Sequence, residues 1–175
     1  MSIGAVNTIK RTQSGELIGY NTDHLGFKES LLEYCNDVFL KTKETFLSVQ
    51  ALILGTGGAS KAVAYALEEI GFKVIFVSRN RSENVLSYDD INKTLIYNCA
   101  IIVNCTPLET SPNIDVCPDI PYQYISDNHI LYDLIYNPEK TLFLKKGEEN
   151  GATIISGLRM LELQAEAAWN IWKKD

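Results

Sequence analysis

Short apolar runs recur along the chain between stretches of mixed polarity. The runs are continuous rather than alternating, which is typical of strands buried on both faces of a sheet. They predict strands at residues 51–54, 73–77, 101–104, 130–135 and 153–155. The stretches at residues 59–70, 139–150 and 157–173 predict helices, the second with Pro138 near its start and Gly151 just past its end. Buried strands that alternate with helices indicate an α/β fold with a doubly wound, mostly parallel sheet.

The N-terminal residues follow another pattern. Residues 5–11 and 16–21 are strand-like on either side of a turn, which predicts a hairpin. Thr22 or Asp23 is suited to cap a helix that runs to about residue 34. The hairpin and helix lie outside the parallel scheme, so we expect them to form an edge or a connector.

Composition and charge exclude several classes of protein. With 46% hydrophobic and 22% charged residues among 175, the chain has the balance of a soluble globular protein rather than a disordered one. Its apolar runs are too short to span a membrane, and its first residues do not resemble a signal peptide. A net charge of −6 with scattered Lys and Arg argues against a nucleic-acid partner. A cytoplasmic location is the expectation.

The spacing of the cysteines also favours a reducing compartment. Cys35, Cys99, Cys105 and Cys117 form no C-x-x-C pair, and two histidines are too few to favour a zinc site. We therefore expect buried free thiols in a reducing compartment and no metal site.

A glycine-rich turn joins the first buried strand to its helix. The segment is Gly55-Thr56-Gly57-Gly58-Ala59-Ser60. Glycines there allow a tight turn and a close approach to a pyrophosphate, and the helix N-terminus offers free N–H groups. Because Ser60 replaces the third glycine of G-x-G-x-x-G, a plain tight turn is the alternative. Thr106, after the third buried strand, is expected beside the nicotinamide in the same crevice.

The end of the second buried strand indicates which dinucleotide is bound. An NAD site usually has Asp or Glu there, whereas this chain has Ser78-Arg79-Asn80-Arg81 and no carboxylate before Glu83. Arg79 can form a forked, charge-assisted pair with a 2′-phosphate. The sequence therefore predicts NADP rather than NAD, with a solvated arginine as the alternative.

Seven segments in order make the chain similar to the shikimate dehydrogenase family. They are G-A-V-N-T at 4–8, G-Y-N-T-D-H-L-G at 19–26, G-T-G-G-A at 55–59, S-R-N at 78–80, N-C-T-P at 104–107, Y-D-L-I-Y-N-P at 132–138 and G-L-R-M-L-E-L-Q-A at 157–165. The resemblance implies NADP-dependent, reversible reduction of 3-dehydroshikimate to shikimate. It also implies that residues 1–30 are an interdomain connector with part of the substrate site, and that residues 31–175 are a Rossmann-like NADP-binding domain.

Individual site residues follow from this resemblance. It implies substrate contacts from Asn7, Asp23, Tyr136 and Gln164, and contacts with the nicotinamide from Leu134 and Gly157. Asp23 matches a catalytic aspartate that pairs with a lysine to move a proton. Taken from the residues alone, Asp23 is a helix cap, Asn7 a strand residue at a sheet edge and Tyr136 a core tyrosine.

One family segment has no match in this sequence. N-V-T-x-P-x-K, which carries the lysine, does not occur, so the isolated chain is expected to have little or no dehydrogenase activity. A quinate/shikimate dehydrogenase and a non-catalytic nucleotide-binding module are the alternatives, and the sequence leaves a homodimer open.

The last helix carries two expectations about its surface. Its stripe of apolar residues is expected to be core, and consists of Leu158, Leu161, Ala165 and Trp172. If a substrate domain is missing, apolar surface should also be exposed on residues 1–30 and on this helix.

Overall fold

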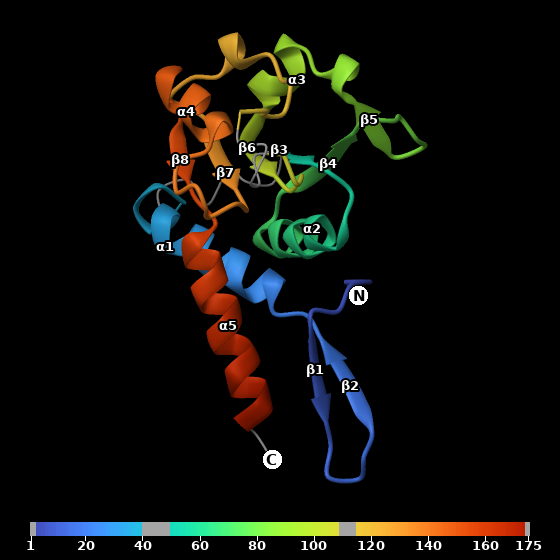
Figure 1. Cartoon of the computed structure of the whole chain (residues 1–175). Coiled ribbons are helices and arrows are strands. Elements are labelled where there is room, and N and C mark those ends of the chain that lie inside the picture. The colour runs from blue at the N-terminus through green and yellow to red at the C-terminus, as the bar shows by residue number, and fades with distance from the viewer. Residues whose placement is uncertain (1–2, 40–49, 109–114, 174–175) are drawn as a thin grey trace.

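The structure is a computed structural model that describes residues 3–39, 50–108 and 115–173, with the backbone alone at residues 35–39. An antiparallel hairpin of β1 (Thr8–Arg11) and β2 (Leu17–Tyr20) precedes a parallel sheet (Figure 1). The strands of the sheet are β3 (Gln50–Leu54), β4 (Lys73–Ser78), β5 (Val85–Ser87), β6 (Cys99–Asn104), β7 (Ile130–Asp133) and β8 (Thr153–Ile155). The helices are α1 (Asp23–Phe39), α2 (Gly58–Ile70), α3 (Lys93–Asn98), α4 (Leu142–Glu149) and α5 (Leu158–Lys173), with short 3-10 turns η2 (Tyr88–Asp90) and η3 (Tyr122–Tyr124).

The strand order of the sheet is β5-β4-β3-β6-β7-β8, and every neighbouring pair is parallel. This confirms the predicted doubly wound α/β fold, because the order steps outward from β3 in one direction and then from β6 in the other. Leu54, the last residue of β3, pairs with Val77 of β4 and Asn104 of β6. In such sheets ligands bind outside the carboxyl ends of the strands, where the order reverses.

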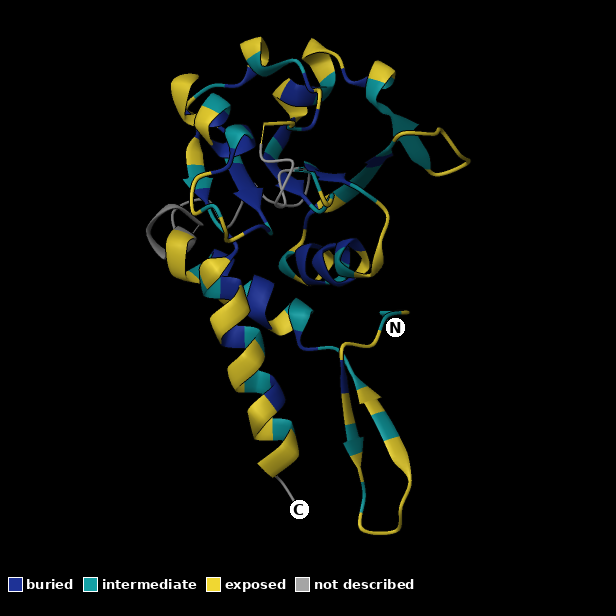
Figure 2. Ribbon diagram, in the orientation of Figure 1, coloured by how far each residue is buried: buried dark blue, intermediate teal, exposed yellow. Residues whose placement is uncertain are grey.

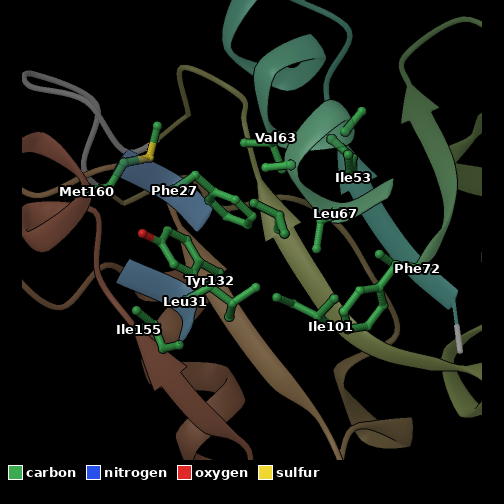
Figure 3. Packing of buried hydrophobic residues seen from close by; sticks show 14 residues of the cluster. Phe27, Leu31, Ile53, Val63, Leu67, Phe72, Ile101, Tyr132, Ile155 and Met160 are labelled. Carbon is green, nitrogen blue, oxygen red and sulfur yellow. The ribbon is translucent and has the colours of Figure 1, made fainter. Parts of the chain in front are cut away.

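Each face of the sheet buries its own apolar cluster. On one face α1 and α2 pack against the strands, and Figure 3 shows Phe27, Leu31 and Tyr132 at the centre of this cluster. The Phe27 and Tyr132 ring centroids lie 4.7 Å apart, and the Tyr132 hydroxyl is 2.7 Å from Ser30 Oγ. Helix α1 is thus part of the core, and the domain boundary expected at residue 30 falls inside this helix.

Two short elements, the edge strand β5 and the helix α3, are absent from the sequence-based prediction. Strand β5 has three half-buried residues, and α3 has six residues of which Ile96 is the buried one. Neither is long enough to show an apolar run or a helical periodicity. The connection from β4 to β5, residues 79–84, contains no helix.

Two expectations about helix starts are wrong. The helix expected over residues 139–150 begins at Leu142, because Thr141 Oγ1 accepts the N–H of Leu144 and caps it there. In the first turn of α1, the side chain that accepts a backbone N–H is that of Asn21, with 3.2 Å from His24 N to Oδ1. The hydroxyl of Thr22 is instead engaged in the site described below.

Helix α5 packs with a different face from the one expected. Met160, Leu163 and Ala168 are buried, whereas the stripe expected to be core is exposed, namely Leu158, Leu161, Ala165 and Trp172. The reason is that α5 packs on α1 with a single face, while the stripe lies a fraction of a turn away.

Apolar side chains are exposed on the hairpin and on α5, as expected for those segments. Figure 2 shows both extending from the sheet with largely exposed surfaces. They touch where Trp172 Nε1 donates to the Ile9 carbonyl (3.0 Å). Val6, Ile9 and Leu17 are each more than half exposed.

Other sequence expectations concern thiols and membrane segments. Cys99, Cys105 and Cys117 are free thiols, while the side chain of Cys35 lies outside the described residues. In the ranges that the structure covers, no helix is long and apolar enough to cross a bilayer, and no three acidic, Cys or His side chains gather as metal ligands would.

Candidate functional site

The turn after β3 has a backbone that only glycine adopts readily. Gly55 has φ +109°, and its N–H donates to the Val77 carbonyl (2.8 Å). A Cβ on Gly55 would lie 3.0 Å from the Cys105 carbonyl oxygen. The first glycine of the motif therefore lets the chain turn sharply between β4 and the end of β6.

The next glycines leave an open cradle at the N-terminus of α2. Gly57 caps the helix with an extended backbone, and no side chain among the described residues forms a capping hydrogen bond there. A Cβ on Gly57 would meet nothing within 4 Å, and the nearest atom to one on Gly58 is Ala5 Cβ at 3.8 Å. Ser60 Oγ donates to the Gly57 carbonyl (2.6 Å) and so points back into the turn. The cradle fits a pyrophosphate, which needs free N–H groups and close backbone approach.

A cleft of about 430 Å³ opens beside this cradle. It is lined by residues at or just beyond the carboxyl ends of β3, β4, β5 and β6, namely Gly55, Thr56, Gly57, Ser78, Arg79, Asn80, Tyr88, Cys105, Thr106, Pro107 and Leu108. Seven of the residues predicted to bind the cofactor are among them, and Tyr88 is an addition that the sequence did not indicate. The sequence does not predict the short strand β5, and it is the pairing of β5 with β4 that brings Tyr88 to this edge.

Arg79 is the cationic side chain of this cleft. It is exposed and forms no ion pair with any residue that the structure describes, whereas Arg81 pairs with Asp90 (3.2 Å). Ser78 Oγ donates to the Asn80 carbonyl (2.7 Å), which fixes the turn that carries Arg79. A guanidinium without an ion-pair partner among the described residues, in a cleft whose described lining holds no carboxylate, is suited to bind a phosphate.

Thr106 is held by a buried polar network. Asn104 Oδ1 accepts from the Thr106 N–H (3.0 Å) and hydroxyl (2.7 Å), and Asn104 Nδ2 donates to Asp133 (3.1 Å). The Asp133 carboxylate also accepts from the Ile135 N–H (3.0 Å) and the Thr141 hydroxyl (2.7 Å). One carboxylate thus joins the loops after β6 and β7 to the start of α4.

Burial raises the pKa of Asp133 from 3.8 to about 6, although its three hydrogen bonds limit the rise. A raised pKa means that the folded state binds the proton more tightly than the unfolded state. The carboxyl therefore stabilises the fold below about pH 4, and this contribution is lost as the pH rises through about 6.

Asp133→Asn is expected to remove this pH dependence. Between about pH 5 and about pH 7.5 the free energy of unfolding of the variant should gain about 1.4 kcal/mol relative to the wild type. Urea unfolding at both pH values measures the change, and Asp127→Asn, at an exposed carboxylate, is the control. A gain that is the same for both variants would contradict the role assigned to burial.

A second cleft, of about 330 Å³, lies on the other side of the α2 N-terminus. Its lining residues come from the hairpin, α1, α2, the loop after β7 and α5, and are Asn7, Asp23, Ala59, Leu134, Tyr136, Gly157, Met160, Leu161 and Gln164. All four residues implied to contact the substrate lie here, as do Leu134 and Gly157, implied to contact the nicotinamide. A Cβ on Gly157 would lie 2.1 Å from the Leu134 carbonyl oxygen, so glycine allows these two segments to touch.

Hydrogen bonds connect the polar residues of this second cleft. Asn7 Nδ2 donates to Asp23 Oδ1 (2.7 Å), and Asn7 Oδ1 accepts the Thr22 N–H (2.8 Å). The Thr22 hydroxyl donates to Gln164 Oε1 (3.2 Å) across the α1–α5 contact. Thr22 is fully buried, and the sequence carries no signal for its place in the site, because its link to Gln164 exists only once α5 packs on α1.

The chain is similar in sequence and in structure to proteins of known activity. No protein-family model matches the chain. The shikimate dehydrogenase (NADP(+)) of Clostridium botulinum is 39% identical over 97% of this chain and 65% of the relative. A solved shikimate dehydrogenase in complex with NADP+ has a TM-score of 0.81 and 32% identity, covering 98% of this chain and 62% of that chain. The enzyme of Thermus thermophilus, in complex with NADP(H) and shikimate, has a TM-score of 0.75 and 31% identity, covering 98% of this chain and 63% of that chain.

The similarity to shikimate dehydrogenases predicted from the ordered segments is confirmed. It extends over nearly the whole of this chain in both sequence and structure. The chain spans 62% and 65% of the length of the first two curated relatives it matches.

Proposed function

We propose that this chain is the NADP-binding part of a shikimate dehydrogenase, which reduces 3-dehydroshikimate to shikimate reversibly. One observation carries the proposal: the cleft with Arg79 and the cleft with Asn7, Asp23 and Gln164 flank the same helix N-terminus. Relatives with this name, and solved relatives in complex with NADP+ or with NADP(H) and shikimate, support it. The division into a connector at residues 1–30 and an NADP-binding domain at residues 31–175 is part of the proposal, with α1 continuing from the first part into the second.

In this proposal the first cleft holds the dinucleotide. The α2 N-terminus and the Gly55–Ala59 turn face the pyrophosphate, and Arg79 binds the 2′-phosphate between Ser78 and Asn80. Thr106, Leu134 and Gly157 lie toward the nicotinamide. The cofactor supplies hydride exchange with the carbon that bears the substrate hydroxyl.

The second cleft is proposed to hold the substrate. Asn7, Tyr136 and Gln164 offer hydrogen bonds to its hydroxyl groups. Asp23, whose Oδ1 accepts from Asn7, is placed to hold a lysine that moves the hydroxyl proton. Because the N-V-T-x-P-x-K segment does not occur in this sequence, the isolated chain should show little or no turnover of shikimate. A module that only binds nucleotides has no chemical need for the polar residues Asn7, Asp23 and Gln164 in a second cleft. These residues therefore favour an enzyme over a non-catalytic binding module.

A cytoplasmic location and a homodimer complete the proposal. Three free thiols are consistent with a reducing compartment. The exposed apolar side chains on the hairpin and α5 offer surface for self-association, which sedimentation over a range of concentrations would detect.

Calorimetric titration of the purified chain with NADP tests the proposed function. We expect saturable binding to the wild type and about fivefold weaker binding to Gly57→Ala, because a Cβ would fill the pyrophosphate cradle at a cost of about 1 kcal/mol. The fold of Gly57→Ala should be unaffected, since φ is −76° and the space is open. Failure of the wild type to bind NADP at millimolar concentration would overturn the proposal.

A further inference from the structure

Tyr88 lies beside Arg79 at the carboxyl edge of the sheet. Strands β4 and β5 are parallel, and Ser78 pairs with Ser87, so the residues that follow them leave the sheet next to each other. Both Arg79 and Tyr88 line the 430 Å³ cleft. The sequence places these two residues nine positions apart, and their proximity depends on the pairing of the short strand β5.

The backbone of Tyr88 is held rigidly. Ser87 and Asp90 form a reciprocal capping box around η2, in which Asp90 Oδ2 accepts from both the N–H and the hydroxyl of Ser87 (2.8 Å each). The ring of Tyr88 packs against the apolar cluster on the α3 and α4 face of the sheet. Tyr88 therefore presents its hydroxyl from a fixed position.

The hydroxyl of Tyr88 is available to a ligand. In the part of the chain that the structure describes, it has no hydrogen-bond partner, and no side-chain oxygen there is both fully buried and unpartnered. Burial raises the pKa of Tyr88, which the nearby Arg79 charge partly offsets, so the hydroxyl stays protonated and can donate. A half-buried donor without a partner gains a hydrogen bond when an acceptor enters the cleft.

We propose that Tyr88 is a second residue of the 2′-phosphate subsite and donates a hydrogen bond to the phosphate that Arg79 binds. The inference rests on the proposed NADP function and adds a residue that determines selectivity for NADP over NAD. Arg79 supplies the charge and Tyr88, directly after the neighbouring strand β5, a directed donor, so the phosphate is held from two sides.

The test uses 2′,5′-ADP and 5′-AMP as probes, since they differ in the 2′-phosphate alone. Tyr88→Phe keeps the ring and removes the donor. It is expected to weaken 2′,5′-ADP and NADP binding about fivefold to tenfold and to leave 5′-AMP binding unchanged. Tyr97→Phe, at a tyrosine that is 82% exposed and outside this cleft, is the matched control.

Two results would overturn the inference. One is unchanged binding of 2′,5′-ADP to Tyr88→Phe. The other is an equal loss for 2′,5′-ADP and 5′-AMP, which would assign Tyr88 to the adenosine instead. Circular dichroism of the variant confirms that it is folded. Absence of NADP binding to the wild type is a separate outcome that refutes the proposed function itself.

Discussion

Replacing Arg79 with alanine is expected to weaken NADP binding tenfold to a hundredfold and to leave NAD binding almost unchanged. A charge-assisted hydrogen bond to a phosphate contributes roughly 1.5–3 kcal/mol, and a forked guanidinium makes two. Arg79 has no ion pair with another described residue, so its removal breaks no internal contact of that kind. Calorimetric titration with each dinucleotide measures the two affinities.

Arg81→Ala is the matched control for this experiment. Arg81 is two residues farther along, is paired with Asp90 and is not among the residues that line the cleft. Its removal should change the affinity for NADP less than twofold, because an exposed ion pair contributes about 0–1 kcal/mol to stability and does not touch the ligand. Equal losses of NADP and NAD affinity in Arg79→Ala would contradict the assignment of Arg79 to the 2′-phosphate.

Gly26→Ala is expected to lower the free energy of unfolding by about 1–2 kcal/mol. Gly26 lies where α1 crosses α5, and a Cβ there would lie 2.6 Å from the Met160 carbonyl oxygen and 2.9 Å from the Gln164 nitrogen. Both are backbone atoms, so α5 would have to move as a unit. Overpacking of this kind costs about 1–3 kcal/mol or more, which exceeds the gain of about 1 kcal/mol from alanine in a helix.

Urea unfolding measures this loss, with Gly57→Ala as the control because its Cβ meets nothing within 4 Å. The same displacement should break the hydrogen bond from Thr22, the residue before α1, to Gln164 of α5. A free energy of unfolding within about 0.5 kcal/mol of the wild type would show that the helices separate easily. In that case the close approach of α1 to α5 at Gly26 would not be what positions Gln164.

The two proposed subsites depend on the fold to different degrees. The cradle for the pyrophosphate is local, since Gly55 to Ser60 lie within one turn and its following helix. The cleft of Asn7, Asp23 and Gln164 depends on a contact between the hairpin, α1 and α5 that spans most of the chain.

The sequence by itself predicts the α/β class, five of the six strands of the sheet, and the glycine turn with Arg79 beyond the next strand. These features depend on local properties: continuous apolar runs, glycines that permit a sharp turn, and the residue types that end each strand. The sequence alone likewise shows that the N-V-T-x-P-x-K segment of the shikimate dehydrogenases does not occur in it.

Only the tertiary structure decided which distant residues come together in each cleft. Tyr88 reaches the cleft because β5 pairs with β4, and Thr22 joins the substrate side because α5 packs on α1. It also decided which face of α5 is buried, and that Asp133 is enclosed with a raised pKa. These features arise from contacts between residues far apart in the sequence, whose free energies depend on packing and burial that no local pattern encodes.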